Sequence, residues 1–115
     1  MLRIFNVCLW MLEGSSMLGG AQIESKRGSA STQHDKDLAR QLKRASSSVA
    51  LNVAEGAAVR DGRRRARYGD ALGSALESRA AIRVAVAIGY VDAMPPQLAG
   101  RFRHIIRVLE KVTLG

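Results

Sequence analysis

The chain has 115 residues, which is enough for one domain with one modest core and too few for two. Hydrophobic residues make up 47% of the chain, but aromatic residues only 4%. The core must therefore consist of Ala, Val, Leu and Ile, which favours closely packed helices over a β-sandwich. Its 18 Lys and Arg exceed its 10 Asp and Glu, and 14 of the 18 are Arg, the side chain best suited to bidentate phosphate contacts.

Residues 1–33 differ in composition from the rest. Leu2, Phe5, Leu9 and Leu12 share one helical face, which predicts a short amphipathic helix, and the Gly- and Ser-rich stretch that follows is typical of a flexible connector. The alternative is a signal peptide that ends near Ala21. Asn6 and Glu13 argue against it, because Asn6 interrupts the apolar run and Glu13 ends it. The single Cys8 excludes an internal disulfide and fits a reducing cytoplasm.

Residues 34–115 are predicted to form the bundle core, with three main helices at about 36–55, 62–88 and 96–113. The first has an apolar face at alternating three- and four-residue steps, with Asp35 placed to cap it and Gly56 to end it: Leu38, Leu42, Ala45, Val49 and Val53. Small residues at 45–48 and 50 would allow a neighbouring helix to pack closely.

The second helix follows Asp61 as its cap and has an apolar face that also contains Arg79: Tyr68, Leu72, Ala75, Ile82 and Val86. Either the helix rotates slightly at Arg79, or Arg79 is a buried or interface cation that needs a carboxylate such as Glu55 or the Glu77 of a neighbour. The last helix begins at Pro96 and has a heptad-like stripe: Leu98, Phe102, Ile105, Leu109 and Val112. No stretch alternates with the period of a strand, and none is long enough to cross a membrane.

The densest charge lies at the start of the second helix, where five arginines are crowded: Arg60, Arg63, Arg64, Arg65 and Arg67. Like charges repel, and a helix N-terminus disfavours cations, so a phosphate chain that binds these groups would offset the cost. If five phosphates were neutralised, the log–log salt slope of binding would be about −4.5. A solvated charged turn is the alternative.

A second basic surface is predicted on the last helix: Arg101, Arg103, Arg107 and Lys111. An ordinary wet face of an amphipathic helix explains this row more simply. The aromatic residues are too dispersed to form a stacking platform for bases, so contacts to RNA or DNA should be dominated by phosphate, with weak sequence preference.

No catalytic constellation is apparent. Ser46 to Ser48 lack a matching His, and the carboxylates Glu55 and Glu77 lack the Glu-x-x-His pairs of di-metal bundles. The sequence therefore predicts no enzyme, no metal and no cofactor. Glu55 is expected to bond the turn or to pair with Arg44, and Asn52 to bond local backbone groups.

Three segments stand out as motifs: Gln41-Leu42-Lys43-Arg44-Ala45-Ser46-Ser47-Ser48-Val49-Ala50-Leu51-Asn52-Val53-Ala54-Glu55-Gly56, Gly73-Ser74-Ala75-Leu76-Glu77 and Gly89-Tyr90-Val91. In this order they resemble a known family, the bacterial four-helix-bundle proteins of 23S ribosomal RNA intervening sequences, which also includes the accessory variability determinant of diversity-generating retroelements. The resemblance covers about Asp37 to Leu109.

The resemblance implies an up-and-down four-helix bundle, here with a short or irregular first helix, that assembles as a homo-oligomer, commonly a pentamer. For the retroelement members it also implies nucleic acid and a reverse transcriptase as partners. The sequence therefore predicts a non-enzymatic, cytoplasmic nucleic-acid-binding accessory protein. The alternative is a protein–protein interaction scaffold with no nucleic-acid role, because three helices carry small residues and apolar stripes.

Overall fold

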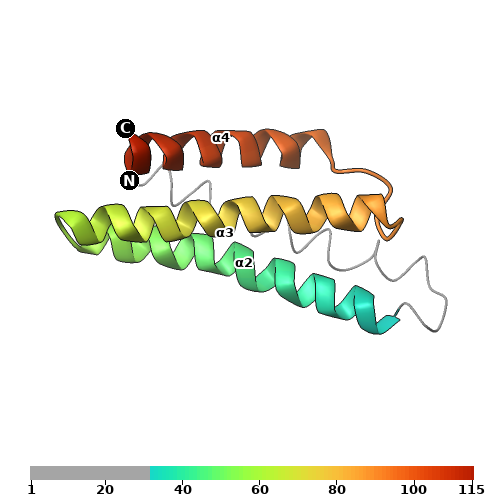
Figure 1. Ribbon diagram of the computed structural model, residues 1–115. Coiled ribbons are helices and arrows are strands. Elements are labelled where there is room, and N and C mark those ends of the chain that lie inside the picture. The colour runs from blue at the N-terminus through green and yellow to red at the C-terminus, as the bar shows by residue number, and fades with distance from the viewer. Residues whose placement is uncertain (1–31) are drawn as a thin grey trace.

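The computed structural model describes residues 32–115, and the regular secondary structure of this part of the chain consists of helices alone. Its helices are α2 (Thr32–Ala58), α3 (Gly62–Ala87) and α4 (Pro96–Leu114), which run antiparallel to one another in sequence order (Figure 1). The all-helical class is confirmed for these residues, which contain no strand. The predicted helix from Leu2 to Leu12, and with it the fourth helix of the bundle, lies outside the described residues.

α2 is longer at both ends than the sequence predicts. It begins at Thr32, so residues 32 and 33 belong to the helix and not to the connector, and Asp35 lies within it. At the other end it continues through Gly56 to Ala58. Gly56 was expected to end the helix, but it is buried there against Tyr68: a Cβ at Gly56 would lie 2.6 Å from the Cε1 atom of the tyrosine ring. The glycine therefore provides space for an aromatic ring.

α3 and α4 begin at the predicted residues. Asp61 precedes α3, and its side chain accepts a hydrogen bond from the backbone N–H of Arg63, so it is the N-cap. The φ angle of Asp61 is 63°, in the left-handed region that residues other than glycine rarely adopt. Pro96 occupies the first turn of α4, where its missing N–H is no loss. The three-residue turn at 59–61 therefore brings the start of α3 against the end of α2.

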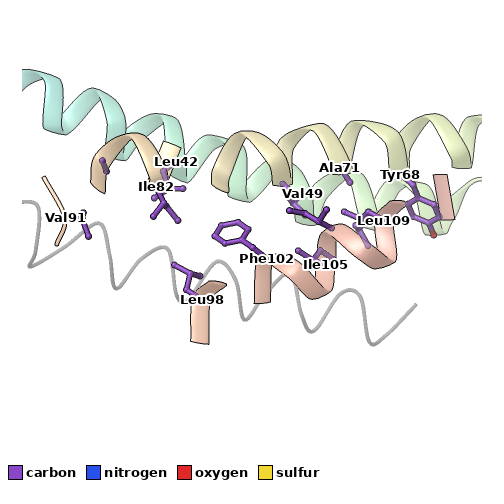
Figure 2. Packing of buried hydrophobic residues seen from close by; sticks show 14 residues of the cluster. Leu42, Val49, Tyr68, Ala71, Ile82, Val91, Leu98, Phe102, Ile105 and Leu109 are labelled. Atoms are coloured by element: carbon purple, nitrogen blue, oxygen red, sulfur yellow. The ribbon is translucent and has the colours of Figure 1, made fainter. Parts of the chain in front are cut away.

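α3 lies between the other two helices. It packs against both α2 and α4, whereas no Cα atom of α2 lies within 8 Å of one in α4 (Figure 1). Side chains of α4 such as Phe102, Ile105 and Leu109 are fully buried and point toward the other helices (Figure 2). The predicted apolar stripes of α2 and α4 form this core, except that Leu38 is half-buried and Val112 is 39% exposed.

The buried face of α3 is rotated relative to the predicted one. Tyr68, Ala75 and Ile82 are buried as expected, but Leu72 and Val86 are only half-buried. Their place is taken by three small residues: Ala71, Ser78 and Ala85. Small side chains on this face let the backbones of α2 and α3 approach closely, which brings Ser46 and Ser78 together at the centre of the contact, where both are fully buried.

Arg79 is half-buried at the edge of this face and forms no ion pair with the described residues. Glu55, one of the two carboxylates considered as its partner, forms an ion pair with Arg67 instead. Within residues 32–115, no helix is long and apolar enough to cross a membrane.

Candidate nucleic-acid interface

The turn between α2 and α3 gathers the five arginines of the predicted phosphate site at one end of the molecule, but it gives them different tasks. Arg64 is directed inward and half-buried. Its Nε–H is shared between the carbonyl oxygens of Gly56, at 3.2 Å, and Val59, at 2.9 Å. The last carbonyls of a helix lack partners within the helix and favour a cation. Arg64 therefore closes the end of α2, a structural role that the sequence did not predict.

Arg67 is engaged as well. Its Nε lies 3.1 Å from Oε2 of Glu55, and its Nη1 lies 4.0 Å from Oδ2 of Asp70. The expected pair of Glu55 with Arg44 is therefore wrong. Residues 44 and 55 are eleven positions apart in one helix, about 16 Å along its axis, which is too far for an ion pair. The pair that does form joins the last turns of α2 to the first turns of α3.

Arg60, Arg63 and Arg65 remain exposed at the same corner. Arg63 has a loose contact with its capping residue, 3.9 Å from Nε to Oδ1 of Asp61, between side chains that are about three-quarters exposed, so the pair contributes little. Arg60 and Arg65 form neither a hydrogen bond nor an ion pair with any described residue.

The five guanidinium groups do not converge on one point. Arg63 and Arg67 are four residues apart and share one side of α3, whereas Arg64 and Arg65 follow at about 100° each around the helix. The arginines therefore surround the first turns of α3. The three exposed ones that lack a close ion pair with the described residues, Arg60, Arg63 and Arg65, form what we call the corner cluster. A flexible phosphate chain can reach such a cluster, whereas a compact single anion cannot contact all of it.

The basic residues of α4 separate into two groups. Arg103, Arg107 and Lys111 recur every four residues and are all exposed, so they form a row along the outward side of the helix. The sequence predicted that Arg101 belongs to the same basic surface. In the structure Arg101 is half-buried and lies on a different side of α4, so it is not part of this row. We call the three aligned residues the α4 row.

The residues of the first motif form a polar seam between α2 and α3. The Nδ2 group of Asn52 donates to the backbone oxygen of Ser48, at 2.9 Å, and to its Oγ, at 3.0 Å. The hydroxyl of Ser74, from the second motif, bonds Ser48 Oγ at 2.9 Å, and that of Ser78 donates to the carbonyl of Ser74 at 2.8 Å. Two motifs that are far apart in sequence are thus joined through their serines.

Three further motif residues, Arg44, Gly73 and Glu77, are exposed. Arg44 lines an open polar hollow on α2 together with Asp37, Arg40 and Gln41. Gly73 has no neighbour within 4 Å of the position that a Cβ would occupy, so close packing does not explain it. Glu77 has no hydrogen-bond or ion-pair partner among the described residues.

The structure does not bring Glu55 and Glu77 together. Glu55 lies opposite Arg67, and Glu77 is ten residues further along α3, about 15 Å away along its axis. The described part of the chain holds no group of three or more His, Cys, Asp or Glu side chains that could bind a metal ion.

Three packed antiparallel helices with an arginine-rich corner define residues 32–115 as a small basic helical bundle. Residues 21–111 match the family model described as 23S rRNA-intervening sequence protein. The protein belongs to this family, since the match covers most of the chain. Comparison with curated proteins gave no match, and neither did comparison with solved structures.

Proposed function

We propose that the protein is a non-enzymatic, cytoplasmic, self-associating subunit that binds RNA or DNA through phosphates with weak sequence preference. The observation that carries this proposal is the corner cluster, in which exposed guanidinium groups stand at one end of the bundle without strong carboxylate partners among the described residues. Exposed arginines that no acid neutralises are the groups that displace counterions from a nucleic-acid backbone.

The number of free arginines sets the expected strength of the electrostatic contribution. Because Arg64 and Arg67 are engaged within the protein, three of the five arginines are available for phosphates. Three neutralised phosphates give a log–log salt slope of about −2.7 per protomer, in place of the −4.5 expected for five.

The aromatic residues of residues 32–115 support recognition of the backbone over recognition of bases. Tyr68 and Phe102 are buried in the core, and Tyr90 is half-buried in the α3–α4 connection. Stacking on unpaired bases requires exposed aromatic faces. Binding should therefore follow phosphate spacing and shape and should tolerate changes of sequence.

Binding of a structured RNA and of a DNA duplex across a salt series tests this proposal. Changing both Arg60 and Arg65 to Ala should lower the affinity at least tenfold at low salt and flatten the salt slope by about 2. The matched control changes Lys43 and Arg44 to Ala. It removes the same charge from two exposed positions of α2, away from the corner cluster. An equal loss in both variants would show a non-specific charge effect, and a flat salt response of the unchanged protein would overturn the proposal.

A scaffold that binds an acidic protein is the second candidate function. The internal use of Arg64 and Arg67 favours it, as do the exposed apolar side chains of α3, Leu76 and Val84, because protein interfaces need apolar area. Affinity capture from cell extract with and without nuclease treatment separates the two functions. A partner protein retained after nuclease treatment would favour the scaffold, and one lost with the nucleic acid would favour direct binding.

The pentameric assembly and the partnership with a reverse transcriptase belong to the same proposal and rest on the family resemblance alone. Light scattering of the purified protein measures the number of protomers. Co-purification with the reverse transcriptase of a neighbouring gene, in the presence of nuclease, tests the second point.

A further inference from the structure

The outward side of α3 has an unusual composition. α3 contacts α2 through Ser74 and Ser78 and lies against α4 at Gly69, and its third side faces away from both helices. Seven residues that recur every three or four positions are exposed there: Ala66, Asp70, Gly73, Glu77, Ala80, Val84 and Ala87. The side chains of Leu76 and Val84 are 39% and 48% exposed, and Ile88 just beyond the helix is 53% exposed.

A helix side that faces solvent normally carries the charged residues of the helix. Of the six arginines of α3, the exposed Arg63 continues this spacing at the start of the helix, and none lies among the seven residues from Ala66 to Ala87. Its outward side is instead small and apolar, with two carboxylates. Asp70 has a single ion-pair contact in the described part of the chain, the 4.0 Å approach to Arg67, and Glu77 has no partner there.

The α4 row has the complementary chemistry. Arg103, Arg107 and Lys111 are exposed on its outward side, adjoined by one carboxylate, Glu110. Apolar side chains are exposed near its end, with Val112 at 39% and Leu114 at 77%. Asp70 and Glu77 are about 10.5 Å apart along α3, and Arg103 and Lys111 are about 12 Å apart along α4, so the two charge spacings match.

We propose that the outward side of α3 binds the α4 row of a second copy of this chain. The inference rests on the self-association in the proposed function and assigns the surfaces that produce it. If the α3 sides of two copies met each other, four carboxylates would lie in one interface and repel. The α4 row instead supplies three basic side chains to the two carboxylates of the α3 side. Apolar residues of both helices would be buried around these ion pairs.

The two complementary surfaces lie on different helices of one molecule, so the contact is heterologous. Each protomer presents its α3 side to one neighbour and its α4 row to another, which generates a ring or an open filament. The α4 row then serves assembly, and the corner cluster remains for phosphates.

Measurement of molar mass by light scattering, with far-UV circular dichroism as a folding control, tests this arrangement. Val84→Asp places an unpaired carboxylate on the α3 side, and a triple change of Arg103, Arg107 and Lys111 to Glu reverses the α4 row. Each variant is expected to be a folded monomer. Ala80→Glu, at another exposed position of the α3 side, replaces Val84→Asp if that variant loses helicity.

Mixing the two monomeric variants gives the decisive result. Each variant keeps one intact surface, so the mixture should form a one-to-one heterodimer and nothing larger. If either variant retains the mass of the unchanged protein, or if the mixture stays monomeric, the proposal is overturned.

Charge exchange within one chain provides a second readout. Changing Asp70 and Glu77 to Lys should reduce the mass, and adding Arg103→Glu and Lys111→Glu should restore it, because both charge signs are then reversed together at the matching spacing. Loss of mass without restoration would overturn the ion pairing. The Arg60 and Arg65 variant should keep the assembled mass while it loses RNA, so a failure of nucleic-acid binding would leave this inference standing.

Discussion

Gly56 and Gly73 occupy opposite environments in neighbouring helices. A Cβ at Gly56 would lie 2.6 Å and 2.9 Å from two ring carbons of Tyr68, which is 2% exposed and cannot move away. Gly56→Ala should therefore lower the free energy of unfolding by about 1 to 2 kcal/mol, because the clash exceeds the gain in helix propensity. Gly73→Ala meets no atom and should raise it by about 0.5 to 1 kcal/mol. Urea denaturation measures both, and equal signs would contradict the packing at Gly56.

Arg64 can be separated from its neighbours by a substitution that keeps the charge. Arg64→Lys loses the Nε–H that bonds the carbonyls of Gly56 and Val59, and should lower the free energy of unfolding by about 1 kcal/mol. RNA affinity should stay within about twofold, since the charge at this position is unchanged. Arg65→Lys is the control and should leave stability unaltered. A fall in affinity without a fall in stability would assign Arg64 to the phosphates instead.

At these residues, the sequence predicted interactions between residues close together in the chain, but not interactions formed between two helices. The Asp61 cap could be predicted because it acts on a backbone N–H two residues away. The partner of Glu55 could not, since Arg67 approaches it only after the turn folds back. A glycine near a predicted helix end usually marks the end of the helix. Gly56 instead lies within α2, where the absence of a side chain leaves space for the Tyr68 ring of α3, a contact that local sequence does not reveal.

The serine seam is the element that sets how α2 and α3 align. Ser48 Oγ is bonded by both Asn52 and Ser74, so Ser48→Ala should cost more stability than Ser74→Ala. A double-mutant cycle of Ser48 and Ser74 should give a coupling energy of about 0.5 to 1 kcal/mol from chemical denaturation. Additive effects of the two substitutions would show that their hydroxyl groups do not interact.

Among the helices, the sequence predicted α4 most fully because large residues supply its apolar stripe. The buried face of α3 was predicted less well, since Ala and Ser occur on both sides of this helix and its larger side chains at 72 and 86 are only half-buried. The depth of burial is decided by how closely α2 approaches, which depends on small residues of both helices together. The serines at 46 to 48 were the available signal.

For the whole molecule, self-association should couple stability to concentration. If the outward side of α3 is covered by another copy, the thermal midpoint of the unchanged protein should rise as its concentration increases from about 1 to 100 μM, because association binds the folded state. Val84→Asp should abolish this dependence while it keeps the helical signal. Differential scanning fluorimetry measures both, and a midpoint independent of concentration in the unchanged protein would contradict the assembly.

The central position of α3 sets the order in which this part of the chain comes apart. α2 and α4 each lie against α3, and their own backbones do not approach each other within 8 Å, although side chains of all three helices share one apolar core. Deuterium uptake should therefore be slowest in α3 and faster in α2 and α4. Loss of α3 removes both supports at once, and its amides should exchange only when the entire described assembly of helices dissolves.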